Sequence, residues 1–470
     1  MRIHEAGALH GDFGGHGPSW LRLPVDVNDL VPQLWASTVT RNNRGVLTVG
    51  GVDVATLAAE FGTPAYIVDE ADFRSRLRAF RDGFAEAFGG PDTGRVYYAG
   101  KAFLCKGVVR WVAEEGLRLD VCTGGELAVA LAAGMDPARM AFHGNNKSRA
   151  ELSAALDAEV GTIVVDSFAE IERLTELARE NGTRPAVMIR TKVGVEAHTH
   201  EYIATAHEDQ KFGLSLEAAS IAVRRILSAG VLELRGLHSH IGSQIFDTTA
   251  FEVAARRVLK LHADIKAEHG VELPELGLGG GFGMAYTTQD DPQSPETLAA
   301  GLRGIVDTEC AALDVARPII SIEPGRAIAG PSTFTLYEVG TVKPVDLGSG
   351  QVRSYVSVDG GMSDNLRTAL YDASYSATMA SRLSPAPPML ARVVGKHCEA
   401  GDILVKDEFL PGDIVAGDLL AVPGTGAYCR SMASNYNHIV KPPVVAVADG
   451  QARLLVRRET VEDLLRLDVG

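Results

Sequence analysis

The chain is poor in cysteine and has no long apolar run. Its 470 residues include five cysteines, an odd number without the spacing of a metal finger. We therefore expect reduced thiols, which are typical of a cytoplasmic protein rather than of a disulfide-stabilised one. No run of about 18 apolar residues occurs, so no membrane span is expected. Residues 1–20 also lack the apolar centre of a signal peptide.

An excess of positive charge is also missing. The formal net charge is −15 and the isoelectric point is near 5.4. An acidic chain is not expected to have nucleic acid or an anionic membrane as its main partner. Hydrophobic residues make up 46% and charged residues 22%, which is typical of a globular protein.

Between residues 64 and 326 the sequence alternates short β-rich runs with amphipathic segments. Segments such as 124–134 and 216–230 carry apolar residues at three- and four-residue steps, as helices do. This alternation predicts a parallel sheet, and the number of runs favours a closed (β/α)₈ barrel, with 65–69 as a strand outside it. The predicted strands are 65–69, 95–102, 118–123, 140–144, 162–167, 186–190, 234–240, 275–280 and 318–325.

After residue 326 the pattern changes to β-branched runs separated by Gly, Pro and Asp, as in an all-β domain of sandwich or barrel type. We expect three parts. Residues 1–63 form an N-terminal extension that adds one or more strands to the β-domain, 64–326 form the barrel, and 327–470 form the β-domain.

Polar residues follow several of the predicted barrel strands, where functional residues of such barrels gather. They are Lys101, Asp120, His143 with Asn145, the segment "HSHIGSQ" (238–244), the segment "GLGGGFG" (277–283) and the segment "EPGR" (323–326). These side chains are expected to converge on one end of the barrel.

Lys101 stands in "VYYAGKAF", which is otherwise apolar. An isolated lysine at a strand end is most often a surface or salt-bridged residue. The apolar neighbours instead predict a partly desolvated amine, and desolvation favours the neutral form that attacks carbonyl carbons.

The glycines of 277–283 do not have the spacing of a dinucleotide fingerprint. Successive glycines at a strand end either make a tight turn or expose N–H groups that cradle a phosphate. Ser243 could add a hydroxyl donor. The ring of His240 could stack on a planar cofactor, or it could be a packed core histidine.

Glu323 indicates which cofactor these residues could bind together. A buried carboxylate facing a pyridine nitrogen keeps that nitrogen protonated, which pyridoxal phosphate needs in order to act as an electron sink. Flavin and nicotinamide have no comparable need for a lysine together with a strand-end glutamate. The combination therefore predicts a pyridoxal phosphate site.

Six segments, in the same order, resemble those of the pyridoxal phosphate-dependent decarboxylases of the alanine-racemase-like fold, and most of all the diaminopimelate decarboxylases. The resemblance spans about residues 45 to 465. The segments are "YYAGKAF" (97–103), "HSHIGSQ", "GLGGGFG", "EPGRAIAGP" (323–331), "KHCEAGDIL" (396–404) and "GTGAYCRSMASNYN" (424–437).

The resemblance implies roles for individual residues. Lys101 would carry the cofactor, His240 would stack on its ring, and Glu323 would face the ring nitrogen. The other cofactor-binding residues implied are Asp120, Ser243, Gly280, Gly281, Gly325, Arg326 and Tyr428. It also implies a barrel followed by a C-terminal β-domain, in a head-to-tail homodimer whose two active sites lie at the interface.

The family acts on ornithine, arginine, carboxynorspermidine or diaminopimelate, which differ at the end remote from the reaction. Diaminopimelate presents a second carboxylate and ammonium there, so its site needs cations and an acid; arginine holds a carboxylate by a bidentate fork. The resemblance places Arg326, Arg367, Tyr371, Glu399 and Tyr428 around the substrate. Ornithine enzymes typically carry aspartate after the cysteine, whereas Glu399 follows Cys398 here.

The implied reaction is decarboxylation of meso-2,6-diaminopimelate to L-lysine, the last step of lysine biosynthesis. Cys398, reaching the site from the partner chain together with Glu399, is the candidate proton donor, and Lys101 is the competing one. The family's loop usually reads "CESGD"; Ala400 here removes a hydroxyl, with little expected effect. Another decarboxylase of this fold, an amino-acid racemase and a non-catalytic homologue are the alternatives.

Three histidines, His198, His200 and His207, raise the question of a metal site. Their spacing is not that of a zinc-binding helix, and the flanking glutamates favour a solvated loop. We expect no metal there.

Overall fold

The computed structural model describes residues 18, 20–194, 211–348 and 351–470, which divide into two compact units. The barrel unit comprises Arg74–Met284 and Pro292–Ile328. The β unit comprises the described residues up to Phe73, Ala285–Asp291 and Ala329–Gly470. The domain limits expected from the sequence, at 63/64 and 326/327, stay a prediction.

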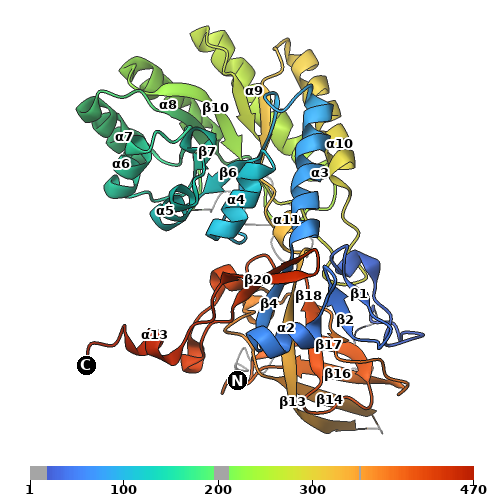
Figure 1. Ribbon diagram of the computed structural model, residues 1–470. Coiled ribbons are helices and arrows are strands. Elements are labelled where there is room, and N and C mark those ends of the chain that lie inside the picture. Colours follow the sequence, from blue (N-terminus) through green and yellow to red (C-terminus); the bar gives the residue numbers. More distant parts are fainter. Residues whose placement is uncertain (1–17, 19, 195–210, 349–350) are drawn as a thin grey trace. The chain divides into compact units, whose positions relative to one another are not determined.

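Eight parallel strands close the barrel, as the alternating pattern predicts (Figure 1). Their order around the ring is β10-β11-β12-β5-β6-β7-β8-β9. Because all eight strands run in one direction, their carboxyl ends meet at one rim. The strands are β5 (Gly94–Ala99), β6 (Arg118–Val121), β7 (Met140–Phe142), β8 (Thr162–Val165), β9 (Ala186–Thr191), β10 (Glu233–Ser239), β11 (Glu275–Gly277) and β12 (Ile319–Ile322).

Helices connect the strands and cover the outside of the ring (Figure 1). They are α3 (Glu70–Phe88), α4 (Lys106–Glu114), α5 (Gly124–Ala133), α6 (Arg149–Asp157), α7 (Phe168–Asn181), α8 (Leu216–Ala229), α9 (Thr249–His269), α10 (Pro295–Leu313) and the short α11 (Arg326–Ala329). Local chemistry sets their ends. The hydroxyl of Ser148 accepts from the amide of Glu151 at the start of α6, and Gly182 ends α7 in the left-handed conformation.

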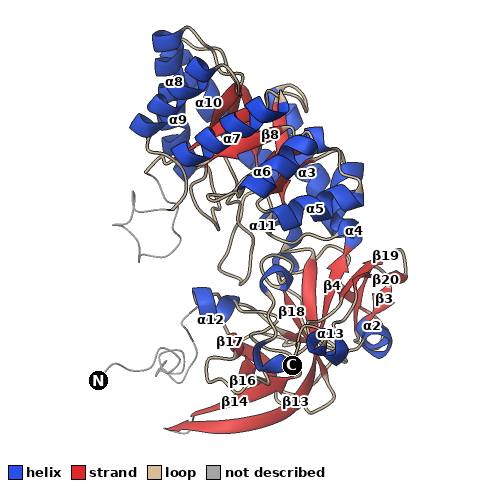
Figure 2. Cartoon of the chain, turned by 90° about the vertical axis from the view of Figure 1, so that its left-hand side faces the viewer, coloured by secondary structure: helices blue, strands red, loops and turns tan. Residues whose placement is uncertain are grey.

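The β unit is built mainly of strands, drawn red in Figure 2. The long strand β13 pairs with β4 and β18 through its first half and with β14 through its second. The sheet runs β17-β16-β14-β13-β4-β19-β20, and β15 pairs with β18. Its strands are β4 (Ala65–Asp69), β13 (Thr333–Gly348), β14 (Gln351–Val358), β15 (Thr378–Met379), β16 (Pro388–Val394), β17 (Ile403–Pro411), β18 (Leu419–Pro423), β19 (Val444–Ala448) and β20 (Gln451–Val456).

Strand β4 lies between β13 and β19. The prediction that 65–69 lies outside the barrel is therefore confirmed. Its residues are buried throughout, which explains why the run is continuously apolar up to Asp69.

The N-terminal part of the β unit has a small antiparallel sheet of its own, β1-β2-β3. Its strands are β1 (Thr40–Arg41), β2 (Leu47–Val49) and β3 (Val52–Asp53), and α2 (Val54–Phe61) follows. Apolar residues of this segment, such as Leu47 and Leu57, pack in one core with Ile67 and Phe334. The unit also contains α12 (Arg367–Tyr371) and α13 (Val461–Leu465).

Within the described parts of the chain, no helix combines the length and the apolar character needed to cross a membrane.

Candidate active site

Lys101 lies two residues beyond the end of β5, the first barrel strand. The amide of Ala99 donates to the carbonyl of Pro324 (3.1 Å), and the amide of Gly100 donates to the carbonyl of Asp120 (2.9 Å). Lys101 is exposed, so the expected partial desolvation of its amine by its neighbours is wrong for this chain. The reason is local: the chain turns after Ala99, so Ala102 and Phe103 are buried while Lys101 is not.

The glycine turn follows β11 and accepts no side chain. A Cβ atom on Gly280 would lie 2.3 Å from the carbonyl oxygen of Glu323, and one on Gly281, whose φ is +110°, would lie 2.5 Å from that of Gly242. The amide of Gly280 donates to Nδ1 of His240 (3.2 Å), which fixes the imidazole beside the turn. The interpretation of these glycines as a tight turn is therefore confirmed, and their binding of a phosphate stays a prediction.

Ser243 and Arg326, both predicted to bind the cofactor, contact each other. The guanidinium of Arg326 donates from Nη2 to Oγ of Ser243 (2.9 Å). Gly325, immediately before, would bring a Cβ atom to 3.0 Å from the Cβ atoms of Ala99 and Ala102. The turn after β12 is therefore packed against the end of β5.

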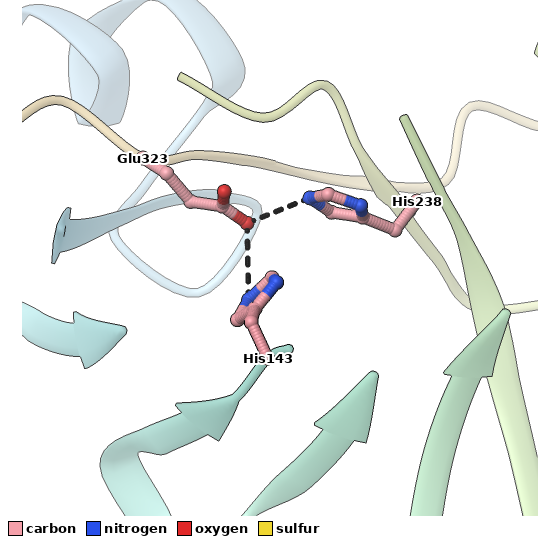
Figure 3. Close-up of side chains that lie close together, drawn as sticks. All are labelled: His143, His238 and Glu323. Carbon is pink, nitrogen blue, oxygen red and sulfur yellow. Dashed lines mark hydrogen bonds and ion pairs between the residues drawn. The ribbon is translucent and has the colours of Figure 1, made fainter. Parts of the chain in front are cut away.

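Glu323 lies at the centre of a buried polar cluster (Figure 3). Its Oε1 atom lies 2.9 Å from Nε2 of His238 and 3.3 Å from Nε2 of His143. The two imidazole rings meet edge to face, with centroids 4.9 Å apart. Asp120 lies near the same nitrogen of His143, with Oδ1 3.7 Å from Nε2. Four strands, β6, β7, β10 and β12, thus contribute to one cluster.

The two carboxyl groups of this cluster differ in protonation. Burial, followed by the negative charge of Glu323, raises the pKa of Asp120 well above its ordinary value. Burial alone would raise the pKa of Glu323 too, but the imidazoles of His238 and His143 lower it well below its ordinary value. Asp120 is therefore the protonated carboxyl and Glu323 the ionised one.

Burial favours the neutral form of two imidazoles at this rim, those of His143 and His240. Burial lowers the pKa of His143 well below its ordinary value, against the pull of Glu323. Burial, and then the positive charge of Lys101, lower the pKa of His240 as well. A neutral, partly buried ring beside the glycine turn is suited to stacking on a planar ligand.

Three residues of this rim were given no role by the sequence reasoning. His143 and His238 stand at strand ends, as noted there, but their convergence on Glu323 depends on closure of the barrel. Arg190, on β9, stacks on the ring of Phe212 at 4.3 Å, and its charge acts on Asp120. Its place near the end of a predicted strand was the available signal.

The β unit holds the other predicted site residues. Arg367 is only 5% exposed, so a surface loop arginine is excluded. Tyr371, four residues on, is 61% exposed, and Tyr428 adopts a left-handed conformation with φ +60°. Which ligand groups these residues contact stays a prediction.

Cys398 is exposed, on a loop that is itself well fixed. The amide of Cys398 donates to Oδ1 of Asn437 (2.9 Å). The buried ring of His397 bonds Oδ2 of Asp402 through Nδ1 (2.9 Å) and stacks on Tyr436. The loop therefore presents the thiol and Glu399 on a defined backbone.

The metal question raised by His198, His200 and His207 lies outside the described residues. Among the residues described, His143, His238 and Glu323 form the only group with the composition and proximity of a metal-ligand set. Of the two imidazoles, His238 is hydrogen-bonded to Oε1 of Glu323, and His143 lies beside the same oxygen at 3.3 Å.

Comparison with known proteins decides the family. Residues 70–330 match the family model described as "Pyridoxal-dependent decarboxylase, pyridoxal binding domain". A diaminopimelate decarboxylase of Mycobacterium tuberculosis is 56% identical over 94% of this chain and 98% of its own length. The chain belongs to the diaminopimelate decarboxylase family.

Other members of the diaminopimelate decarboxylase family match equally broadly. The Mycobacterium leprae member is 53% identical over 100% of both chains. The crystal structure of the M. jannaschii enzyme in co-complex with L-lysine superposes with a TM-score of 0.85 at 29% identity, covering 93% of this chain and 98% of that one. The predicted fold class, a (β/α)₈ barrel with a separate β-domain, is confirmed.

The barrel rim fits pyridoxal phosphate, the cofactor that the family implies. Glu323 is ionised and buried, as a partner for a pyridine nitrogen must be. The Nε2 atom of His143 is buried beside it without a hydrogen-bond partner in the described structure. The glycine turn beyond β11 offers bare backbone of the kind that binds phosphate.

Proposed function

We propose that this protein removes one carboxylate of meso-2,6-diaminopimelate as carbon dioxide and releases L-lysine, the last step of lysine biosynthesis. The observation that carries the proposal is the ionised Glu323, which is buried among imidazoles at the rim of the barrel. Relatives of this chain are named diaminopimelate decarboxylase. A cytoplasmic location, expected for a step of amino-acid biosynthesis, is part of the proposal.

Each residue of the rim would then have a distinct task. Lys101 would hold the cofactor covalently, and Glu323 would keep a proton on the ring nitrogen. Pyridoxal phosphate, when bound, supplies an electron sink for the pair left behind by carbon dioxide. His240 would lie against the ring, with Asp120 nearby.

The phosphate would be held by neutral and cationic donors. They are the hydroxyls of Ser243 and Tyr428, the backbone amides of Gly280, Gly281 and Gly325, and the guanidinium of Arg326. The contact between Arg326 and Ser243 supports this, because it places two of these donors together.

The substrate's remote head group carries a carboxylate and an ammonium. Arg326, Arg367 and Tyr371 would bind the carboxylate, and Glu399 the ammonium, while Tyr428 would touch substrate and phosphate. Burial of Arg367 supports an anionic ligand, because a buried cation needs a counter-charge.

Cys398 and Glu399 of the partner subunit would complete each site in a homodimer. The Sγ atom of Cys398 would return a proton to the carbon that has lost carbon dioxide, with Nζ of Lys101 as the competing donor. The exposure of Cys398 in its own chain supports a role outside that chain.

The test is carbon dioxide release by the purified protein, supplied with pyridoxal phosphate, from four substrates: meso-diaminopimelate, ornithine, arginine and carboxynorspermidine. We expect turnover of meso-diaminopimelate at least about a hundredfold above the others, because the remote carboxylate gives a charged contact that they lack. Absence of its turnover refutes the proposal. Solvent-proton exchange at the α-carbon without carbon dioxide release would favour a racemase instead.

A second measurement tests Lys101 independently of turnover. Borohydride reduction of the loaded protein should fix the cofactor to the peptide that contains Lys101, and Lys101→Ala should abolish this labelling. Lys106→Ala, five residues on, is the matched control and should label fully. Labelling at another lysine would contradict the assignment.

A further inference from the structure

Arg367 is a buried cation with no carboxylate paired to it in the part of the chain that the structure describes. Arg367 is the first residue of helix α12, and it is 5% exposed. Among the described residues no carboxylate forms an ion pair with it, and its Nε atom is buried without a hydrogen-bond partner. Because an unpaired buried charge is strongly destabilising, such a guanidinium needs an anionic ligand.

Two tyrosines enclose this guanidinium. Its Cζ atom lies 4.8 Å from the ring centroid of Tyr286 and 5.8 Å from that of Tyr375. The rings meet edge to face, with centroids 5.1 Å apart and an interplanar angle of 76°. Aromatic faces stabilise a cation without neutralising it, so the positive charge stays available to a ligand.

The hydroxyl of Tyr375 fixes the orientation of the Arg367 guanidinium. It accepts a hydrogen bond from Nη1 of Arg367 (2.7 Å) and contacts Sγ of Cys429 (3.7 Å). That sulfur lies 3.5 Å from Oδ1 of Asn365, which also accepts from the backbone amide of Arg367 (3.3 Å). The contacts therefore close a ring that begins and ends at Arg367.

Of the guanidinium nitrogens, Nη1 is the one that takes part in this ring of contacts. Burial raises the pKa of Tyr375 well above its ordinary value, so its hydroxyl stays protonated and acts as a neutral acceptor for Nη1. A planar fork held along one edge presents the remaining N–H groups in a fixed direction.

We propose that Tyr375 and Tyr286 are positioning residues for substrate specificity, which orient Arg367 to bind the carboxylate that the reaction leaves in place. This inference rests on the proposed function. It adds that selection for a remote carboxylate depends on a tyrosine cage as well as on the arginine. The product, L-lysine, retains that carboxylate, whereas 1,5-diaminopentane differs from it only in lacking the carboxylate.

The test compares binding of these two ligands to the pyridoxal phosphate-loaded enzyme by calorimetric titration. Tyr375→Phe keeps the ring and removes the hydroxyl, so it should weaken L-lysine about tenfold, as expected for a lost hydrogen bond to a charged group. Binding of 1,5-diaminopentane should change less than about twofold, because it has no carboxylate for Arg367. The KM for meso-diaminopimelate should rise together with the Kd for L-lysine, and kcat should change little.

Controls separate positioning from a general disturbance. Tyr355→Phe alters another tyrosine that stacks on an arginine, Arg392 at 6.0 Å, and should leave both affinities unchanged. In an Arg367→Lys background, Tyr375→Phe should have no further effect on L-lysine. If Tyr375→Phe does not fold, Tyr286→Leu, which removes one aromatic face, should show the same selective loss.

Equal weakening of both ligands, or an unchanged L-lysine affinity, overturns the inference. Failure of the unmodified enzyme to release carbon dioxide from meso-diaminopimelate would refute the proposed function instead. The two failures are therefore distinguishable.

Discussion

The Nε2 atom of His238 lies 2.9 Å from Oε1 of Glu323, and both side chains are buried. The histidine comes from β10 and the glutamate follows β12. An ionised carboxylate cannot donate, so the imidazole is the donor. This single bond links the protonation of Glu323 to a residue that need not touch the cofactor.

Replacing His238 by leucine should shift the pH dependence of the enzyme. His238 is the leading cause of the lowered pKa of Glu323, so its removal raises that pKa. On acidification the carboxylate is then protonated at a higher pH than in the unmodified enzyme, so the acidic limb of kcat/KM should move to higher pH. The measurement is the pH profile of kcat/KM.

His262→Leu provides the control for that experiment. His262 is also buried, but it lies on α9 and is not among the residues around Glu323. Its replacement should leave the acidic limb in place. An unmoved limb in His238→Leu would show that this bond does not set the ionisation of Glu323.

Mixing two inactive variants should restore activity if Cys398 serves the partner subunit. Lys101→Ala and Cys398→Ala each disable both sites of their own homodimer, but a mixed dimer has one intact site. Random reassortment of equal amounts makes about half the dimers mixed, so about a quarter of the unmodified activity should return. Carbon dioxide release after mixing is the readout.

The double variant, with both substitutions in one chain, should stay inactive on its own. Native mass spectrometry would establish that mixed dimers form. Mixed dimers without recovered activity would assign the Cys398 loop to its own subunit.

Lys147→Met should destabilise the barrel unit strongly. The Nζ atom of Lys147 lies 2.6 Å from Oε1 of Glu170 and donates to the carbonyls of Gly144 and Val164. Burial already raises the pKa of Glu170, and removing the lysine leaves the carboxyl without its cation. We expect a loss of about 3–5 kcal/mol in the free energy of unfolding.

Chemical denaturation would measure that loss, and a second substitution would identify its cause. Lys147→Met combined with Glu170→Gln removes the buried charge and should recover part of the stability. A single variant as stable as the unmodified protein would contradict the importance of this ion pair.

Asp364 should make the β unit less stable as the pH rises. Burial raises its pKa to about 7, while the hydroxyl of Tyr337 and the amide of Gly361 donate to the carboxyl. Between about pH 4 and 7 the folded state therefore binds more protons than the unfolded one, and stability falls with increasing pH.

Asp364→Asn removes this titration and should flatten the slope. The difference between unfolding midpoints at pH 5 and pH 8 is the quantity to compare. An equal difference in variant and unmodified protein would assign the slope to other groups.

Sequence patterns predicted the elements well, because most of them are local. The run at 65–69 is continuously apolar, since both faces of β4 are covered, and its two neighbours in the sheet come from beyond residue 330. Lys101 and Glu323 were found from the rule that barrel function lies at strand ends. That rule predicts which residues lie at the rim of the barrel, but it does not predict which of them contact one another.

The cluster around Glu323 could not be predicted in the same way. His143 and His238 reach Glu323 from separate strands, and the contact depends on the registers that close the barrel. The burial of Arg367 likewise depends on Tyr286, which lies about 80 residues earlier. The exposed position of Lys101 was missed because apolar neighbours in the sequence do not specify which way a turn directs a side chain.

The pairing of β4 with β13 constrains how the chain folds during synthesis. Residues 65–68 pair with 333–336, and β19 completes the other edge of β4. All eight barrel strands are made between these partners. Because domains tend to fold as they emerge, the barrel can close on the ribosome while β4, an apolar strand with two open edges, waits for residues beyond 330. During that interval the open edges of β4 are free to pair with strands of other chains.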